Sequence, residues 1–306
     1  MINIIITSYG EPNATSRAIA CFLNQDIEQE FQITVIDPFP ETEKFLNKKY
    51  EKEFKTNKIN FFLDPGEGKS YALNIFLEKI YSQNKEDIII LTDGDVYVSQ
   101  NTVEEICNVF KNQSIGCITG RPVLLNPRRK FWGYASHVAF EGIHKTRLKL
   151  SKQNKFFECS GYLFAIRNGV LQGFPLETSE DSIISYLFHK KGYKIKYAPK
   201  AEVYVINPQN WKDFKLQKIR NIKAHENLNK IAPDMPRTKS FTNEIKEGAF
   251  LALTYPKNIR EIFFTPLLFA TRLYIYLKAF YDLKFKKKKY EDGWRKEETK
   301  STRGLD

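Results

Sequence analysis

The chain has 306 residues, of which 42% are hydrophobic and 27% are charged, with a net charge of +12 and four cysteines. This composition excludes an intrinsically disordered chain. The cysteines are widely spaced and form no CxxC pair, which argues against a disulfide framework or a zinc site and favours reduced thiols in the cytosol. Residues 1–210 carry 26 Lys and Arg against 24 Asp and Glu, whereas residues 211–306 carry 22 against 12. The last third of the chain is therefore expected to face phosphates, either of lipids or of nucleic acid.

Short apolar runs alternate with longer helical patterns along the first 120 residues. The N-terminal run MINIIITSYG has no basic segment before it and is expected to be a buried strand, not a signal peptide. Strands are predicted at 4–7, 32–36, 60–63, 88–92 and 115–119, and helices at 13–24, 41–54, 70–81 and 100–111. This alternation is typical of an α/β fold in which helices cover a mostly parallel sheet. Ligands of such folds bind beyond the carboxyl ends of the strands, where Tyr9, Glu11, Asp37, Lys69, Asp93 and Asp95 fall.

The segment LTDGDVYVS (91–99) indicates a cation site. Two carboxylates, Asp93 and Asp95, follow a very apolar strand and are separated by one glycine. Asp95 is expected to coordinate a divalent cation, Mn²⁺ or Mg²⁺, while Asp93 bonds a ribose hydroxyl or a metal-bound water. The cation would neutralise a diphosphate leaving group. A structural Asp–Gly turn is the alternative for this segment.

The segment DPGEGKSYALN (64–74) contains a GKS sequence that suggests a phosphate-binding P-loop. That motif also requires a glycine five positions before Gly68, and Leu63 occupies this position. The segment is therefore not a P-loop.

Several short motifs follow one another in a characteristic order, although each is weak by itself. They are TSYGEP (7–12), Asp37, GKSYALN (68–74), DGD (93–95), CSGYLFAIR (159–167), TSED (178–181) and QKIR (217–220). Through most of residues 1–230 this order resembles the family 2 glycosyltransferases. The resemblance implies a GT-A domain over 1–230, with a Rossmann-like, mostly parallel sheet flanked by helices, and a nucleotide-diphospho-sugar donor.

The resemblance also implies which residues contact the donor. Tyr9 and Glu11 would lie against the nucleoside, and Asp37 would contact the base or ribose. Lys69 would reach the diphosphate, where a compact cation is useful. Arg220 would hold the same diphosphate from the basic helix predicted at 211–232.

The resemblance also implies, through the CSG and TSED motifs, which residues contact the acceptor. Ser160 and Gly161 would shape the acceptor pocket, with Glu180 beside it. Asp181 falls where the family keeps its general base, which removes the proton of the acceptor hydroxyl during inversion. An N-terminal helix cap is the structural alternative for Glu180 and Asp181, and both roles can hold together.

The QKIR segment departs from the family pattern at one position. Gln217 and Arg220 match the polar positions of the Q-x-x-R-W motif of processive members, and Gln217 is expected on the acceptor side. Asn221 replaces the tryptophan that supports a growing polymer. This favours the addition of a single sugar. A merely solvated basic face remains the alternative for this helix.

Residues 231–306 are expected to form a basic, helical extension. The run at 262–280 is apolar but contains Pro266, Arg272 and Lys278, and such charges disfavour a membrane-spanning helix. Thr271, Lys278 and Asp282 share one stripe of the helical wheel, and the remaining arc is apolar. Because lysines follow this amphipathic helix directly, residues 262–289 are expected to lie in the headgroup layer. A core helix packed on the catalytic domain is the alternative. The basic run Pro127–Lys130 is predicted to be a flexible loop near the active site.

Together these features predict an inverting, metal-dependent and non-processive glycosyltransferase. Its acceptor would be membrane-associated, either lipid-linked or a glycan, and the protein would lie on the cytoplasmic face of the cell membrane. A catalytically inactive nucleotide-sugar-binding scaffold is the second hypothesis. A nucleic-acid binder is disfavoured, because the chain lacks the glycines and aromatic residues of the common RNA-binding modules and resembles no recognition helix.

Overall fold

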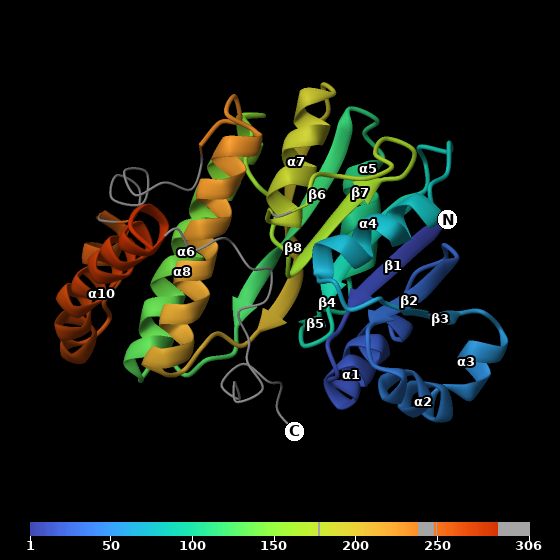
Figure 1. Cartoon of the computed structure of the whole chain (residues 1–306), viewed down its shortest axis with the longest axis horizontal. Coiled ribbons are helices and arrows are strands. Elements are labelled where there is room, and N and C mark those ends of the chain that lie inside the picture. Colours follow the sequence, from blue (N-terminus) through green and yellow to red (C-terminus); the bar gives the residue numbers. More distant parts are fainter. Residues whose placement is uncertain (177, 238–247, 249, 287–306) are drawn as a thin grey trace.

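In the part of the chain that the structure describes, eight strands form one sheet in the order β3-β2-β1-β4-β7-β6-β8-β5 (Figure 1). The structure is a computed structural model that describes residues 1–176, 178–237, 248 and 250–286. The strands are β1 (Ile2–Thr7), β2 (Phe31–Asp37), β3 (Ile59–Leu63), β4 (Ile88–Asp93), β5 (Tyr97–Val98), β6 (Ile115–Leu124), β7 (Leu163–Arg167) and β8 (Lys194–Val205). The helices are α1 (Pro12–Leu23), α2 (Pro40–Lys49), α3 (Glu51–Lys55), α4 (Lys69–Lys79), α5 (Thr102–Phe110), α6 (Phe131–Lys152), α7 (Glu180–Lys190), α8 (Trp211–Ile231) and α10 (Ile259–Lys284).

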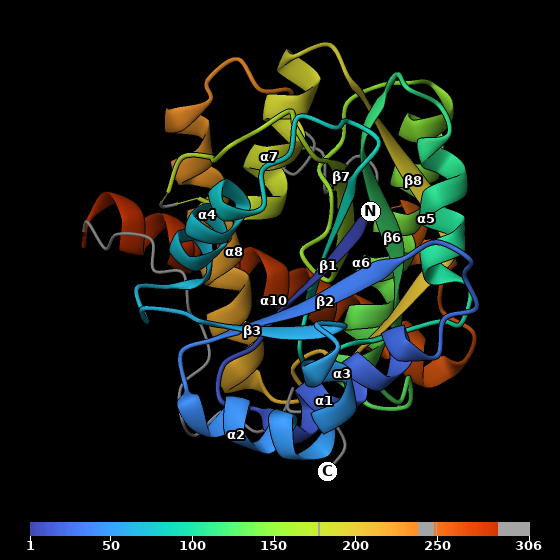
Figure 2. The same cartoon turned by 90° about the vertical axis from the view of Figure 1, so that its right-hand side faces the viewer.

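The strands β3, β2, β1 and β4 run parallel to one another, and β3, β2 and β1 are labelled in Figure 2. Successive side chains of a strand point to opposite faces of the sheet. Ile4 and Ile6 of β1 therefore pack into one hydrophobic cluster and Ile5 into another, and all three are fully buried. A strand segment that is buried on both faces must be apolar at every position, which explains the continuous III run at 4–6.

The sheet is mixed beyond β4. β7 runs antiparallel to both β4 and β6, and β5 runs antiparallel to β8, whereas β6 and β8 are parallel. The predicted α/β class and the nine elements predicted before residue 120 are present, but the helix predicted at 41–54 is divided at Tyr50. The Tyr50 hydroxyl donates to the carbonyl oxygen of Ser16 at 2.7 Å, and its backbone leaves the helical region.

Three helices form a layer beside the sheet. α10 packs on both α6 and α8, which lie between it and the strands in Figure 1. Aromatic rings join the three helices, because Trp132 of α6 stacks on Trp211 of α8, which in turn contacts Tyr274 of α10.

α10 buries several polar residues and exposes many large apolar ones. Its polar residues Glu261, Thr265, Thr271 and Asp282 are buried, and Lys278 donates to Asp282 at 2.9 Å. The polar stripe predicted from the helical wheel therefore faces the protein. Large apolar side chains lie on the outside, including Ile259, Phe263, Leu267, Tyr274, Leu277 and Tyr281. By length and composition α10 is the one helix among the described residues that could cross a membrane.

A buried ion pair attaches the start of α10 to the domain. Arg128 donates from Nε and Nη2 to the two carboxylate oxygens of Glu261, at 2.6 and 2.7 Å. Glu261 is 4% exposed. Hydrogen bonds from Arg128 are the main reason why the pKa of Glu261 falls to about 2. Residues 127–130 form a loop as predicted, but Arg128 is held by α10 and the segment does not line the cavity described below, so its predicted flexibility and place near the active site are wrong.

We predict that Arg128→Met lowers the free energy of unfolding by about 3 kcal/mol at pH 7, because it leaves the Glu261 carboxylate buried and unpaired. The folded pKa of Glu261 lies below its ordinary value of 4.5, so this stabilisation is present above that value and is lost as the pH falls toward 2. Urea titrations followed by tryptophan fluorescence should therefore show that the variant and the wild type differ less in free energy of unfolding as the pH is lowered. Arg129→Met, at an exposed position, is the matched control. Equal losses in the two variants would contradict the role of this pair.

Candidate active site

The site begins where two parallel strands end side by side. Thr7 of β1 and Asp93 of β4 are register partners, and the Thr7 hydroxyl donates to Asp93 Oδ1 at 3.2 Å. Gly94 follows directly, and a Cβ atom there would lie 2.9 Å from Thr15 Oγ1 and 3.1 Å from Ser8 Cβ. Only glycine lets the Asp–Gly–Asp turn pack so closely on the loop after β1.

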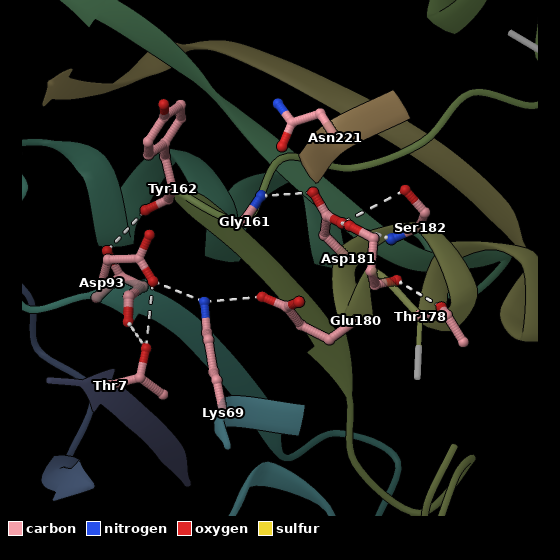
Figure 3. A network of polar contacts seen from close by, with 12 residues as sticks. Thr7, Lys69, Asp93, Gly161, Tyr162, Thr178, Glu180, Asp181, Ser182 and Asn221 are labelled. Carbon is pink, nitrogen blue, oxygen red and sulfur yellow. Dashed lines mark hydrogen bonds and ion pairs between the residues drawn. The ribbon is translucent and has the colours of Figure 1, made fainter. Parts of the chain in front are cut away.

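Lys69 joins the end of β4 to the start of α7. Its Nζ lies 2.6 Å from Asp93 Oδ1 and 2.7 Å from Glu180 Oε1 (Figure 3). Burial by itself lowers the pKa of Lys69, but the two carboxylates outweigh it and raise the pKa above its ordinary value. The ammonium group is therefore charged, and it connects α4, β4 and α7.

Asp181 is adjacent to Glu180 in sequence, but its carboxylate points elsewhere (Figure 3). Its Oδ2 accepts from the backbone N–H of Gly161 at 2.8 Å, and its Oδ1 accepts from the backbone N–H of Ser182 at 2.8 Å. Ser179 donates a further hydrogen bond to Oδ1. Glu180 thus faces Lys69 while Asp181 faces the CSG loop, and the start of α7 presents two carboxylates with different partners.

Asp37 differs from the other predicted donor-binding residues. Its side chain is completely buried, and its oxygens accept from the backbone N–H groups of Gly10 and Phe39 at 2.9 and 2.8 Å. Burial raises its pKa. In this structure the carboxylate holds the loop that carries Tyr9, whose ring packs edge-on against Phe39. The predicted contact between Asp37 and the donor stays a prediction.

A single large cavity brings the other predicted residues together. Its volume is about 2130 Å³, more than the 300–1,000 Å³ typical of a site for one small ligand. It is lined by Tyr9, Glu11, Lys69, Asp93, Asp95, Ser160, Gly161, Glu180, Asp181, Gln217 and Arg220, but not by Asp37. Carboxylates and cations that are distant in the sequence therefore share one cavity.

The cavity also contains a buried cluster that sequence reasoning missed. Glu158 is 3% exposed, its Oε2 accepts from Ser182 Oγ at 2.6 Å, and His225 Nδ1 lies 3.6 Å from the same oxygen. Arg147 Nη2 donates to the Glu158 carbonyl at 3.0 Å. Glu158 directly precedes the CSG motif, and this position was the only signal that could have indicated it.

The protein offers few ligands for a cation. Among the described residues no three His, Cys, Asp or Glu side chains converge into a metal cluster. Asp95 lines the cavity, and Asp93 beside it is already bonded to Lys69 and Thr7. A hard cation here would use one or two carboxylates and take its remaining ligands from water and substrate phosphate, an arrangement common for Mg²⁺.

The family model described as "Glycosyltransferase like family 2" matches residues 2–224. The chain belongs to this family. An N-acetylglucosaminyltransferase of Rhizobium meliloti is 20% identical over 236 residues, which cover 72% of this chain and 54% of that protein. The chain thus spans about half the length of this relative.

Solved structures confirm the predicted GT-A fold for this family member. A mannosyltransferase of Pyrobaculum calidifontis, solved with GDP-mannose and Mn²⁺, matches 93% of this chain and 81% of its own, with a TM-score of 0.56 and 15% identity. The structure of GalNAc-T7 with UDP, GalNAc and Mn²⁺ matches 85% of this chain and 59% of its own, with a TM-score of 0.51 and 16% identity. At these identities the likeness concerns the fold alone.

We predict that Lys69→Met lowers the free energy of unfolding by about 1–3 kcal/mol, because it leaves Asp93 and the buried Glu180 without their shared cation. Differential scanning fluorimetry and urea titration measure this loss. Lys55→Met is the matched control, since its exposed pair with Glu51 should contribute less than about 1 kcal/mol. A Lys69 variant as stable as the control would show that the bridge does not hold the two sides together.

Proposed function

We propose that this protein is an inverting, cation-dependent glycosyltransferase that transfers one sugar from a nucleotide-diphosphate donor to a membrane-associated acceptor. The observation that carries the proposal is the convergence of Lys69, Asp93 and Asp95 with Glu180 and Asp181 around one cavity. Family membership supports the nucleotide-sugar donor.

The donor would lie along the carboxyl ends of β1 and β4. Tyr9 and Glu11 line this end of the cavity and would contact the nucleoside. Lys69 and Arg220 would hold the diphosphate from α4 and α8. Asp95, with Asp93, would hold Mn²⁺ or Mg²⁺, which when bound neutralises the charge of the leaving diphosphate. The two solved relatives that contain Mn²⁺ and a nucleotide support this cation.

Transfer needs a base that faces the acceptor. The acceptor oxygen would attack the anomeric carbon as the bond from that carbon to the diphosphate oxygen breaks, and the diphosphate would leave with the electron pair. Asp181 would take the acceptor's proton. Two backbone N–H groups hold its carboxylate in place. Ser160, Gly161, Glu180 and Gln217 would bound the acceptor.

We predict that Asp181→Asn reduces sugar transfer at least a thousandfold, because an amide cannot accept the proton, while the affinity for the donor changes less than threefold. Donor binding is measured by calorimetry with Mn²⁺, and transfer with a radiolabelled donor and a membrane extract as the source of acceptor. Asp234→Asn, at an exposed carboxylate in the turn after α8, is the control. Retained turnover in Asp181→Asn would remove this residue from the mechanism. A wild-type protein that binds donor but neither transfers nor hydrolyses it would favour the scaffold hypothesis.

We also propose that the outer face of α10 rests on the cytoplasmic surface of the cell membrane, so that residues 231–306 act as an extension of the catalytic domain at 1–230. Exposed apolar residues continue from α10 to Phe250 and Leu253, which are 75% and 69% exposed. Exposed apolar surface of this extent marks an interaction site. The basic residues at 287–289 lie outside the described residues.

We predict that the double variant Phe263→Gln/Leu277→Gln binds vesicles of anionic phospholipid at least tenfold more weakly than the wild type, because it removes two side chains from the outer face of α10. Vesicle co-sedimentation measures the binding. The matched control is Phe45→Gln/Leu63→Gln, which changes exposed apolar residues of α2 and β3. Equal binding of both variants would contradict a membrane-facing α10.

A further inference from the structure

The cavity continues past the reaction site into a passage between α6 and α8. α10 closes the far end of this passage, because it packs on both helices on the side away from the strands (Figure 1). One continuous cavity thus extends from Lys69 to Leu283 near the end of α10. The proposed donor contacts occupy only the end near the strands.

The walls of the passage are mainly apolar. On α6 the lining side chains are small at Ala135, Ala139 and Gly142, which leaves space beside the helix. On α10 the lining residues form an arc between the buried polar side and the outer apolar side. They include Leu268, Phe269, Leu273, Tyr276, Phe280 and Leu283. An apolar, elongated ligand would fit such walls.

Polar atoms without partners mark the place where the passage meets the reaction site. Ser136 Oγ, Arg147 Nη1 and Gln217 Oε1 are buried and have no hydrogen-bond partner among the described residues, and all three residues line the cavity. A buried polar group without a partner is costly. Arg147 is 6% exposed and lines the cavity, so a ligand that reached its buried Nη1 would supply the missing hydrogen bond.

The charges of the lining residues favour a ligand with an anionic group. Besides Arg220, which is proposed to hold the donor's diphosphate, α8 and α10 contribute Lys218, Arg272 and Lys284 to the cavity lining, whereas Glu226 is the one acidic residue that these two helices contribute within their described length. An anionic group between these helices would be attracted, and phosphate is the anion that Arg and Lys bind most readily.

We propose that the passage binds the hydrocarbon chain of an acceptor that carries a phosphate-linked headgroup. This inference rests on the proposed function and selects the lipid-linked class of acceptor over a free glycan. The headgroup would meet Arg147 and Gln217 near Asp181, and the chain would extend between α6 and α8 against α10. The outer face of α10 would bring the same passage next to the bilayer from which such a lipid comes.

The test compares the binding of dodecyl phosphate, below its micelle concentration, with that of butyl phosphate. Calorimetry is performed on the wild type, on Ala139→Trp and on Lys145→Trp. Ala139 is exposed to the passage, so tryptophan there should fill the space without disturbing the core, whereas Lys145 lies on the same helix outside the cavity. We expect wild type and Lys145→Trp to bind dodecyl phosphate at least tenfold more tightly than butyl phosphate. Ala139→Trp should lose at least tenfold in affinity for the long chain only.

Two further measurements separate the possible failures. Equal affinity of Ala139→Trp and Lys145→Trp for dodecyl phosphate would refute binding of the chain in the passage. Loss of this binding only in Phe263→Gln/Leu277→Gln would also refute it, because the chain would then lie on the outer face of α10. The affinity for the nucleotide-sugar donor should be unchanged in Ala139→Trp. Intact donor binding and transfer with no preference for the long chain would refute this inference and leave the proposed function standing. Absence of donor binding in the wild type would refute the proposed function itself.

Discussion

The salt bridges of Lys69 with Asp93 and Glu180 hold together the parts of the protein on which the rest of the site depends. Lys69 begins α4, Asp93 ends β4 and Glu180 begins α7, so one ammonium group joins three elements that are spread over more than one hundred residues of the chain. The bridge places positive charge where a diphosphate would lie. It also fixes the start of α7, and hence the direction of Asp181 toward Gly161. Stability and the geometry of the proposed reaction therefore depend on the same contact.

A second constraint comes from the polarity of α10. A helix of a soluble domain normally buries its apolar side, but α10 buries Glu261, Thr265, Thr271 and Asp282 and exposes Phe263 and Leu277. The arrangement is stable toward the protein because the buried carboxylates are paired with Arg128 and Lys278. The apolar side chains on the outer side of α10 make no favourable contact with water. A helix with apolar residues both outside and toward the cavity is well suited to separate a bilayer from a passage that receives lipid.

The sequence predicted the first half of the fold well and the second half poorly. Apolar runs such as III (4–6) and IIILT (88–92) are buried on both faces, and this requirement is visible in composition alone. β7 and β8 were not predicted: LFAIR was considered only as part of the CSGYLFAIR motif, and KIKYAPKAEVYV contains lysines and a proline that interrupt a continuous apolar run. The division of α2 from α3 depends on a contact between Tyr50 and Ser16, which are 34 residues apart. Contacts of this kind leave no local pattern.

The candidate site shows the same division between local and distant information. Motif order by itself predicted the family. It also indicated the candidate site residues Lys69, Asp93, Asp95, Glu180 and Asp181, because their spacing after strands and before helices is a local property. Only the tertiary structure decided that Asp37 supports a loop, that Arg128 holds α10, and that Glu158, Arg147 and His225 lie in the cavity. These roles depend on which side chains meet across elements distant in the chain. The physical reason is that burial and pairing of a charge are properties of its surroundings, and folding assembles those surroundings from the whole sequence.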